Sequence, residues 1–217
     1  MLRHQVISYI APGDLVFDIG ANVGDKTASL VKHVDAAVVC VEPQPLCVSV
    51  LQERFSNNPL IKIVQSGVDS VSGFKDLSIC DTQNAISTFS DRWKTGRFQG
   101  LEWNQTMSIK MTTLDDLVRE YGVPRYCKID VEGYEHEVLK GVSQKLGLIS
   151  FEFTSEFVDD CLLCIQRLIR LGYTRFNLSL GENESFYYDK FVRFDEITAS
   201  LWGSRGLKGL WGDVYAN

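Results

Sequence analysis

The sequence has no long hydrophobic run, no cluster of basic residues and little proline, and each absence excludes a class of protein. No apolar stretch approaches the ~20 residues of a membrane-spanning helix, and the N-terminal apolar stretch is too short for a signal peptide. The sequence contains 22 Lys and Arg residues and 28 Asp and Glu residues, which gives a net charge of −6. Nucleic acid and anionic membrane surfaces require clustered positive charge, so we expect neither as a partner. Five prolines among 217 residues argue against a long disordered segment.

The six cysteines do not form a recognisable metal or redox motif. Cys40 and Cys127 lie in apolar runs typical of buried strands, where cysteine packs as a small hydrophobic residue. Cys161 and Cys164 form a C-x-x-C, but it lies within a helical pattern and has no second pair, whereas a structural zinc site needs about four ligands. We therefore expect packed thiols and a reducing, cytoplasmic location. Since no His, Asp or Glu cluster has metal-ligand spacing, we expect no metal.

Strands and helices alternate along the chain, which is typical of an α/β fold with a mostly parallel sheet. The periodicity predicts five buried strands, at 15–20, 36–42, 61–68, 126–131 and 146–153. It predicts further strands at 72–80 and 107–112, and three in the C-terminal tail, at 174–180, 185–194 and 211–216. Since short links join the tail strands, we expect them at an antiparallel edge. No linker divides the chain, so residues 1–217 are expected to form a single domain.

Residues 81–106 interrupt this alternation with a polar, irregular stretch that contains Trp93, Phe98 and Trp103. Loops of this length are often functional, and we expect a lid or a substrate-binding insertion here. The alternative is a surface excursion whose aromatic side chains pack on the sheet.

The most informative stretch is VFDIGANVGDKT at 16–27, a buried strand followed by a glycine-bearing turn and a helix. Gly20 permits a tight turn with positive φ, and Gly24 lets a ligand approach the backbone. Asn22 tolerates unusual backbone angles. Glu42 ends the next strand, where an acidic side chain can accept hydrogen bonds from both hydroxyls of a ribose. The combination predicts a nucleoside-containing ligand at the carboxyl ends of parallel strands.

The turn differs from that of a dinucleotide-binding fold, which has the pattern G-x-G-x-x-G. Asp25 begins the helix, and its charge opposes the binding of a diphosphate there. S-adenosylmethionine carries a ribose and an adenine but no phosphate, and its sulfonium and ammonium groups suit the carboxylate just before the turn. We therefore expect S-adenosylmethionine as the cofactor, bound by Asp18, Gly20, Asn22, Gly24 and Glu42.

A second constellation, KIDVEG at 128–133, ends another buried strand. If the strand continues through it, period-two alternation places Lys128, Asp130 and Glu132 on one face, at the ligand crevice. Asp130 is the first candidate for a base or polarising group, Glu132 is the second, and Glu152, at the end of the fifth strand, is a weaker one. The alternative is an internal ion pair between Lys128 and Asp130 that only orients the loop.

On these motifs the sequence resembles the FkbM family of methyltransferases, which has the Rossmann-like fold of class I S-adenosylmethionine-dependent methyltransferases. The resemblance rests on VFDIGANVGDKT, VCVEP, TTLDDL at 112–117 and KIDVEGYEHEVLKG at 128–141, and it extends over about residues 15–153. It implies methyl transfer to oxygen, often to a hydroxyl of a sugar or a polyketide-type natural product. The segment 81–106 and the tail after residue 155 lie outside the matching motifs, and we expect substrate choice there.

The sequence thus predicts an O-methyltransferase that acts on a hydroxyl of a small molecule or glycan. A nicotinamide-dependent oxidoreductase is one alternative, which the missing G-x-G-x-x-G disfavours. A non-catalytic module that binds S-adenosylmethionine and recognises a partner is another, and the intact KIDVEG disfavours it.

Overall fold

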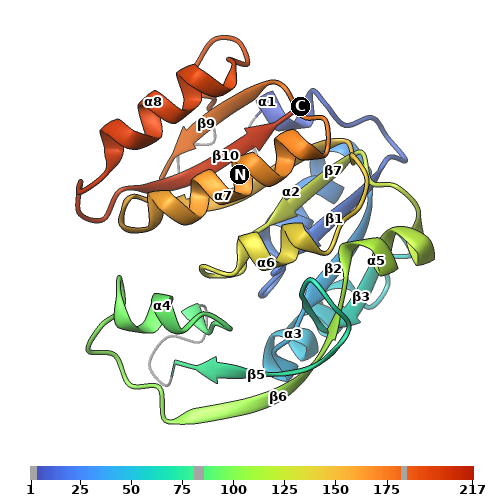
Figure 1. Cartoon of the computed structure of the whole chain (residues 1–217). Helices are drawn as coiled ribbons and strands as arrows, with labels where there is room; N and C mark the ends of the chain where they lie inside the picture. The colour runs from blue at the N-terminus through green and yellow to red at the C-terminus, as the bar shows by residue number, and fades with distance from the viewer. Residues whose placement is uncertain (1–3, 81–85, 182–184) are drawn as a thin grey trace.

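The computed structural model describes residues 4–80, 86–181 and 185–217. Its main feature is a large seven-stranded sheet with the order β3-β2-β1-β7-β8-β10-β9 (Figure 1). These strands are β1 (Leu15–Ile19), β2 (Ala37–Glu42), β3 (Ile61–Gln65), β7 (Tyr126–Ile129), β8 (Leu148–Thr154), β9 (Phe176–Leu180) and β10 (Trp211–Ala216). The first five pair in parallel, and β10 is antiparallel to both β8 and β9. The predicted mostly parallel α/β fold is confirmed, with the antiparallel strand lying one place in from the edge strand β9.

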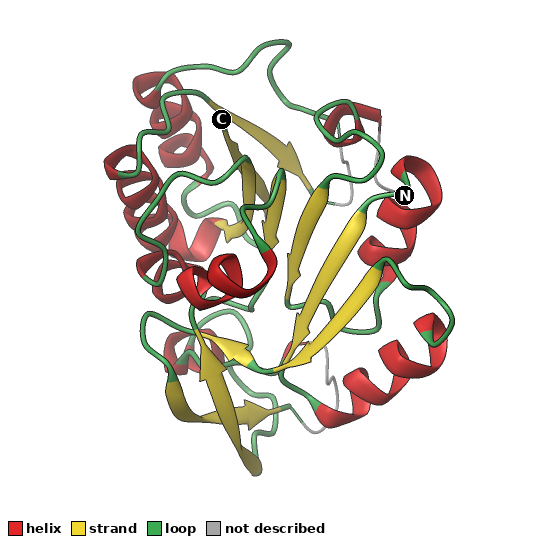
Figure 2. Ribbon diagram, turned by 90° about the vertical axis from the view of Figure 1, so that its right-hand side faces the viewer, coloured by secondary structure: helices red, strands yellow, loops and turns green. Residues whose placement is uncertain are grey.

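Helices cover both faces of the large sheet (Figure 2). One face packs against α1 (His4–Ile7), α2 (Asp25–Val34) and α3 (Pro45–Phe55). The other face packs against α5 (Leu114–Tyr121), α6 (Glu135–Lys140), α7 (Val158–Arg170) and α8 (Phe194–Ser204), with the short 3₁₀ helix η2 (Ser155–Phe157) before α7. The Thr113 hydroxyl accepts a hydrogen bond from the backbone N–H of Asp116 and caps the N-terminus of α5.

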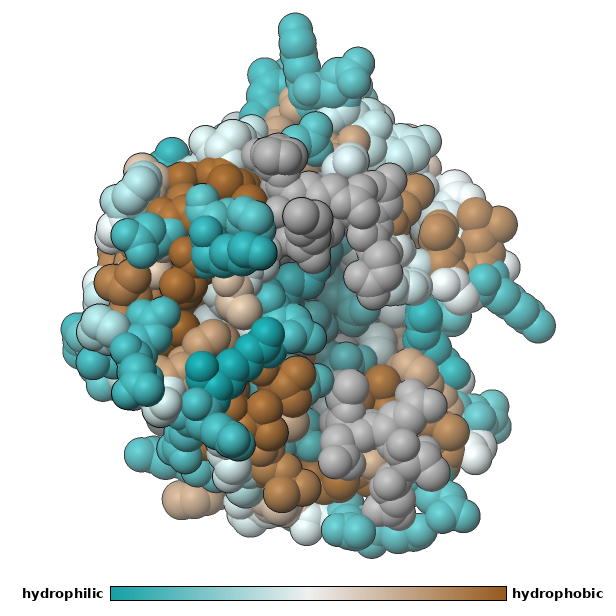
Figure 3. Space-filling view, turned by 180° about the vertical axis from the view of Figure 1, so that it is seen from behind, coloured by the Kyte–Doolittle hydropathy of each residue, from teal (hydrophilic) through white to brown (hydrophobic). Residues whose placement is uncertain are grey.

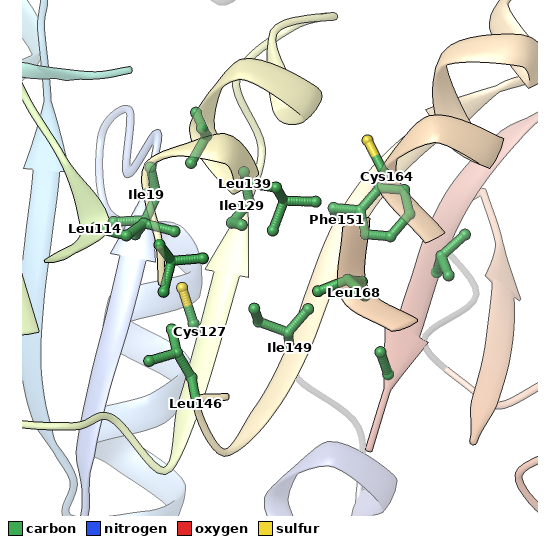
Figure 4. Close-up of a cluster of buried hydrophobic side chains, with 14 of the residues drawn as sticks. Ile19, Leu114, Cys127, Ile129, Leu139, Leu146, Ile149, Phe151, Cys164 and Leu168 are labelled. Carbon is green, nitrogen blue, oxygen red and sulfur yellow. The ribbon is translucent and has the colours of Figure 1, made fainter. Parts of the chain in front are cut away.

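The larger core lies between the sheet and α5 to α8. Ile129 of β7 and Phe151 of β8 lie beside Leu139 of α6 and Cys164 of α7, all of them fully buried or nearly so (Figure 4). Cys161 is buried in the same cluster, so both thiols of the C-x-x-C pack in the core as expected. This packing fixes β7 and β8, whose carboxyl ends carry the polar residues of the candidate site.

A smaller sheet of order β4-β6-β5 lies beside the large one and is built from β4 (Gly67–Val68), β5 (Gly73–Ile79) and β6 (Gln105–Thr112). The predicted single strand at 61–68 is therefore wrong, because the chain leaves the large sheet after Gln65 and Gly67 pairs with Met111 of β6. The Ser66 hydroxyl stabilises the crossing by donating to the backbone oxygens of Gly67 and Lys110, both at 2.8 Å. A Cβ on Gly67 would lie 2.6 Å from the end of the Met111 side chain, so glycine lets β4 and β6 approach without displacing Met111.

The predicted strand at 185–194 is also wrong. Among its described residues, only Val192 forms a bridge, to Phe176, and Phe194 begins α8. The side-chain amide of Asn177 bonds both backbone groups of Tyr188, its Nδ2 donating to the oxygen at 2.9 Å and its Oδ1 accepting from the N–H at 3.0 Å. These side-chain bonds replace the backbone ladder that a strand would form. Residues 182–184 lie outside the described part of the chain.

Over the described residues, the structure contains no helix of the length and apolar character that crossing a bilayer requires.

Candidate functional site

The carboxyl ends of β1, β2 and β7 meet at one edge of the large sheet, and the turn after β1 crosses this edge. Gly20, in this turn, has a φ of 79°. A Cβ on Gly20 would lie 1.8 Å from the backbone oxygen of Asp130, at the end of β7. Only glycine therefore allows the turn to pass so close to the neighbouring strand.

Glu42 fastens this turn to the end of β2. Its Oε2 accepts a hydrogen bond from the backbone N–H of Asn22 and its Oε1 accepts one from that of Gln44, both at 2.9 Å. The side chain is 3% exposed, and burial raises its pKa although the two hydrogen bonds oppose the shift. Asn22 itself has a φ of 48°, in the left-handed region that asparagine tolerates. A carboxylate offers about four lone-pair sites, so Glu42 can also accept from hydroxyls of a ligand.

The strand β7 ends at Ile129, two residues before the predicted end at 131, so the condition for strand alternation through Glu132 is not met, and Glu132 has a φ of 56°. Three acidic side chains nevertheless come together here. One oxygen each from Asp130, Glu132 and Glu152 lies within 4.8 Å of the other two, and we call this group the carboxylate cluster. This spacing would also allow the three groups to surround a cation.

Lys128 neutralises one member of the cluster. Its Nζ lies 2.8 Å from Oδ2 of Asp130 and 3.9 Å from Oδ1 of Asp18, and its side chain is buried. Burial lowers the pKa of Lys128, but the two aspartates outweigh it and the pKa lies above its usual value. The ion pair between Lys128 and Asp130 that the sequence suggested is therefore present.

The other two members have no such counter-ion among the ion pairs of the described residues. Burial, and then the charge of Asp130, raise the pKa of both Glu132 and Glu152 well above the usual range. Oε2 of Glu152 is sealed from solvent and has no hydrogen-bond partner in the described part of the chain. The cluster therefore combines one ion-paired carboxylate with two carboxyl groups that hold a proton more tightly than usual.

Two cavities meet at the carboxylate cluster. The first, which we call the glycine-loop cavity, has a volume of about 80 Å³ and is lined by Gly20, Asn22, Glu42, Asp130 and Glu132, among others. The second, the Trp93 cavity, has a volume of about 220 Å³ and is lined by residues of α4 (Asp91–Thr95), α6, α7 and the end of β8, including Glu152. Seen from behind, the surface is hollowed near its centre and the residues in the hollow are hydrophilic (Figure 3).

Two residues of the predicted cofactor set are absent from the described wall of the glycine-loop cavity. Asp18 is buried, and its Oδ2 accepts a hydrogen bond of 2.6 Å from the Thr27 hydroxyl. A Cβ on Gly24 would lie 2.6 Å from the side chains of both Leu51 and Phe55. Gly24 therefore lets α2 pack against α3, and contact of either residue with a cofactor stays a prediction.

The described part of the segment 81–106 lies against the carboxyl ends of β7 and β8, whereas residues 81–85 lie outside the described residues. Trp93 packs on Gly133, where a Cβ would lie 2.5 Å from the indole ring. The Thr88 hydroxyl donates to the backbone oxygen of Glu132 at 2.6 Å, and Arg97 forms an ion pair with Glu156. Trp93 thus contributes to the wall of a cavity, whereas Phe98 and Trp103 are not among the residues described in that wall.

Sequence analysis missed three residues that line the Trp93 cavity, Tyr134, Glu135 and Thr154. Thr154 had a signal, since it lies two residues after Glu152 on the same face of β8. Glu135 had none, because an acidic residue in the first turn of a helix is common on protein surfaces. In the structure Glu135 is buried, which raises its pKa to about 7, and it accepts hydrogen bonds from the backbone N–H groups of Val131 and Gly133.

The sequence matches a known protein family and two relatives. The family model described as the methyltransferase FkbM domain matches residues 18–197. The hexuronic acid methyltransferase AglP of Haloferax volcanii is 31% identical over 141 residues, which cover 64% of this chain and 54% of that protein. The methyltransferase sdnD of Sordaria araneosa is 27% identical over 166 residues, covering 64% of each chain. The chain thus spans between half and two thirds of the length of these relatives.

Solved structures with a similar fold have little sequence identity to this chain. The precorrin-6y C5,15-methyltransferase of Geobacter metallireducens aligns with a TM-score of 0.49 and 11% identity, covering 97% of this chain and 84% of that one. The fibrillarin of Aeropyrum pernix, solved with natively bound S-adenosylmethionine, aligns with the same TM-score and identity, covering 95% and 67%.

Proposed function

We propose that this chain, which belongs to the FkbM methyltransferase family, transfers a methyl group from S-adenosylmethionine to a hydroxyl of a small molecule or glycan. S-adenosylmethionine is the cofactor that this family implies, as the sequence predicted. The observation that carries the proposal is the position of the carboxylate cluster between two cavities. Asp130 and Glu132 line one cavity and Glu152 lines the other, so the cluster would lie between a cofactor in the first cavity and an acceptor in the second.

The residues of the glycine-loop cavity fit the nucleoside half of this cofactor. Glu42 would accept hydrogen bonds from the ribose hydroxyls, while Asn22 and Gly20 shape the backbone beside it. When bound, S-adenosylmethionine supplies a methyl group on a sulfonium, and the sulfur becomes a neutral thioether after transfer.

The cluster also supplies a group to take the proton from the acceptor hydroxyl. A hydroxyl is a weak nucleophile, and a well-placed base increases its reactivity most when the pKa of the base lies near the working pH. Asp130 is ion-paired with Lys128, whose ammonium group lies 2.8 Å from its Oδ2. Glu132 and Glu152 have raised pKa values, so we favour them over Asp130 as the base, and the ion pair keeps Asp130 in place.

The name of one relative supports a sugar as the acceptor. AglP is named a hexuronic acid methyltransferase, and sdnD is named a methyltransferase. The chain covers only part of each relative, so the residues that line its own cavities are the better guide to its acceptor.

The test is direct. The protein is titrated calorimetrically with S-adenosylhomocysteine, S-adenosylmethionine and NAD, and is then incubated with labelled S-adenosylmethionine and a panel of sugar and polyol acceptors. We expect the two sulfur-containing nucleosides to bind, NAD not to bind, and the label to appear as an acid-stable methyl ether. Binding of NAD alone, or transfer of the label only to nitrogen or carbon acceptors, would refute the proposal.

A further inference from the structure

Three residues that line the Trp93 cavity carry polar atoms that have no hydrogen-bond partner among the described residues. Nε1 of Trp93 and Oγ1 of Thr154 are sealed from solvent and have no hydrogen-bond partner there, and these side chains are only 4% and 3% exposed. Oε2 of Glu152 is also sealed from solvent and has no hydrogen-bond partner in the described structure. A buried polar atom without a partner costs about 1–3 kcal/mol. Three of them on residues that line one cavity point to a ligand that pairs with them.

The three atoms require a ligand that both donates and accepts hydrogen bonds. The indole N–H of Trp93 can only donate, the Thr154 hydroxyl can do either, and Oε2 of Glu152 accepts when the carboxyl group is ionised and can donate when it is protonated. Hydroxyl groups satisfy all three. The Trp93 and Phe157 rings, whose centroids are 5.8 Å apart, provide an apolar wall for the carbon face of a ring. This combination fits a polyhydroxylated ring.

The charges in the wall disfavour an anionic ligand. Arg92 is the one Lys or Arg side chain among the described lining residues, and its Nη1 already contacts both carboxylate oxygens of Asp160, at 2.6 and 2.7 Å. Burial lowers the pKa of His136, which keeps it neutral at neutral pH. Glu135 and Glu152 lie in the same wall. A carboxylate or phosphate on the ligand would therefore meet acidic groups and no unpaired cation.

We propose that the Trp93 cavity is the acceptor subsite and that it selects a neutral, polyhydroxylated ring over the corresponding uronic acid. Trp93 and Thr154 act as hydrogen-bonding specificity residues. This inference rests on the proposed methyl transfer, since it assigns the cavity on the far side of the carboxylate cluster to the acceptor. It also separates this chain from AglP, whose name specifies a hexuronic acid.

The test uses matched sugars that differ only at C6, namely the methyl glycosides of glucose, galactose and mannose and of the three corresponding uronic acids. Binding of each to the protein saturated with S-adenosylhomocysteine is measured by saturation-transfer NMR, and methyl transfer is measured with labelled S-adenosylmethionine. We expect at least one neutral glycoside to bind and to be methylated, with kcat/KM about tenfold or more above its uronic acid partner. Preference for the uronic acids, or binding of no neutral glycoside to the loaded protein, overturns the proposal.

Variants separate binding of the acceptor from folding. Trp93→Phe removes the N–H together with part of the indole, and Thr154→Val keeps the shape and removes the hydroxyl. Each should weaken binding of the neutral glycoside by about three- to tenfold, the value of one neutral hydrogen bond, and leave S-adenosylhomocysteine affinity unchanged. Since the Thr154 hydroxyl has no partner among the described residues, Thr154→Val should leave resistance to urea unchanged or increased, whereas Trp93→Phe and Trp103→Phe should both lower it through lost packing. Trp103→Phe is the matched control, because Nε1 of Trp103 is also buried and unpaired but Trp103 is not among the residues described in the cavity wall.

Each failure has its own signature. Equal effects of Trp93→Phe and Trp103→Phe on the binding of the neutral glycoside would overturn the assignment of the subsite. Failure of the unmodified protein to bind S-adenosylhomocysteine would instead refute the proposed function, regardless of the results of the sugar-binding experiments.

Discussion

Replacement of Glu42 by glutamine tests the proposed ribose contact, and the structure predicts two separate effects. The first is on folding. Both carboxylate oxygens accept hydrogen bonds from backbone N–H groups, of Asn22 and Gln44. Glutamine has one oxygen and one NH₂ group, so either orientation of its amide places a donor against a donor. One buried N–H loses its partner, and we expect the free energy of unfolding to fall by about 1–3 kcal/mol.

The second effect is on the cofactor. A hydrogen bond to a charged group contributes about 1.5–3 kcal/mol, and the variant loses both the charge and one acceptor. The dissociation constant for S-adenosylhomocysteine, measured by titration calorimetry, should therefore rise about 10- to 100-fold. Urea unfolding of the free protein measures the first effect separately. Glu53→Gln, on the exposed side of α3, makes the same chemical change and should alter neither quantity.

Two results would refute this reasoning. If Glu42→Gln destabilises the protein but leaves the affinity unchanged, then Glu42 only holds the loop and the ribose lies elsewhere. If the variant is as stable as the unmodified protein, the two backbone hydrogen bonds do not restrain the side chain as described.

Three further expectations concern the acidic groups. The pKa of Glu135 is raised to about 7, so the folded state binds its proton more tightly than the unfolded state does. The free energy of unfolding should therefore fall by up to about 3 kcal/mol as pH rises from 4.5 to 7. Glu135→Gln should abolish most of this pH dependence when urea unfolding is compared at pH 5 and pH 8. Glu132→Gln and Glu152→Gln should identify the base, because at least one of them should lower kcat by about 10²–10⁴ at unchanged S-adenosylhomocysteine affinity. Asp130→Asn should chiefly lower stability by leaving Lys128 unpaired. A kcat loss confined to Asp130→Asn would identify Asp130 as the base instead. Activity should survive EDTA, and a loss that Mg²⁺ reverses would make the carboxylate cluster a metal site.

The part of the site that could be predicted from the sequence is the part that local backbone geometry dictates. Gly20 is needed because its turn passes close to Asp130, and this requirement leaves a visible pattern of glycines after a buried strand. Glu42 is visible for a similar reason, because the carboxyl ends of parallel strands meet at one edge. Gly24 was identified with a different explanation, since its missing side chain makes room for α3 rather than for the cavity described here.

The Trp93 cavity could not be predicted, because tertiary packing creates it. Trp93 and Thr154 are about sixty positions apart in the chain, and they share a cavity only because the indole packs on Gly133 at the end of β7. The wrong strand at 185–194 has a related cause. Aromatic residues in this stretch imitate strand periodicity, but Phe186 and Phe191 pack against each other and against Tyr9.

The unfavourable features of the structure are concentrated at one place, and their location supports a ligand there. Among the described residues, Asn22, Asp35 and Glu132 are the non-glycine residues with positive φ, and two of the three line the glycine-loop cavity. Glu152, with its raised pKa and unpaired oxygen, lies within 4.8 Å of Glu132. Backbone strain and crowded carboxyl groups each lower stability, and neither is required by the packing of the core. A cationic, hydroxyl-bearing cofactor beside a neutral acceptor would relieve the charge repulsion and pair the orphaned atoms, which selection for stability alone would have removed.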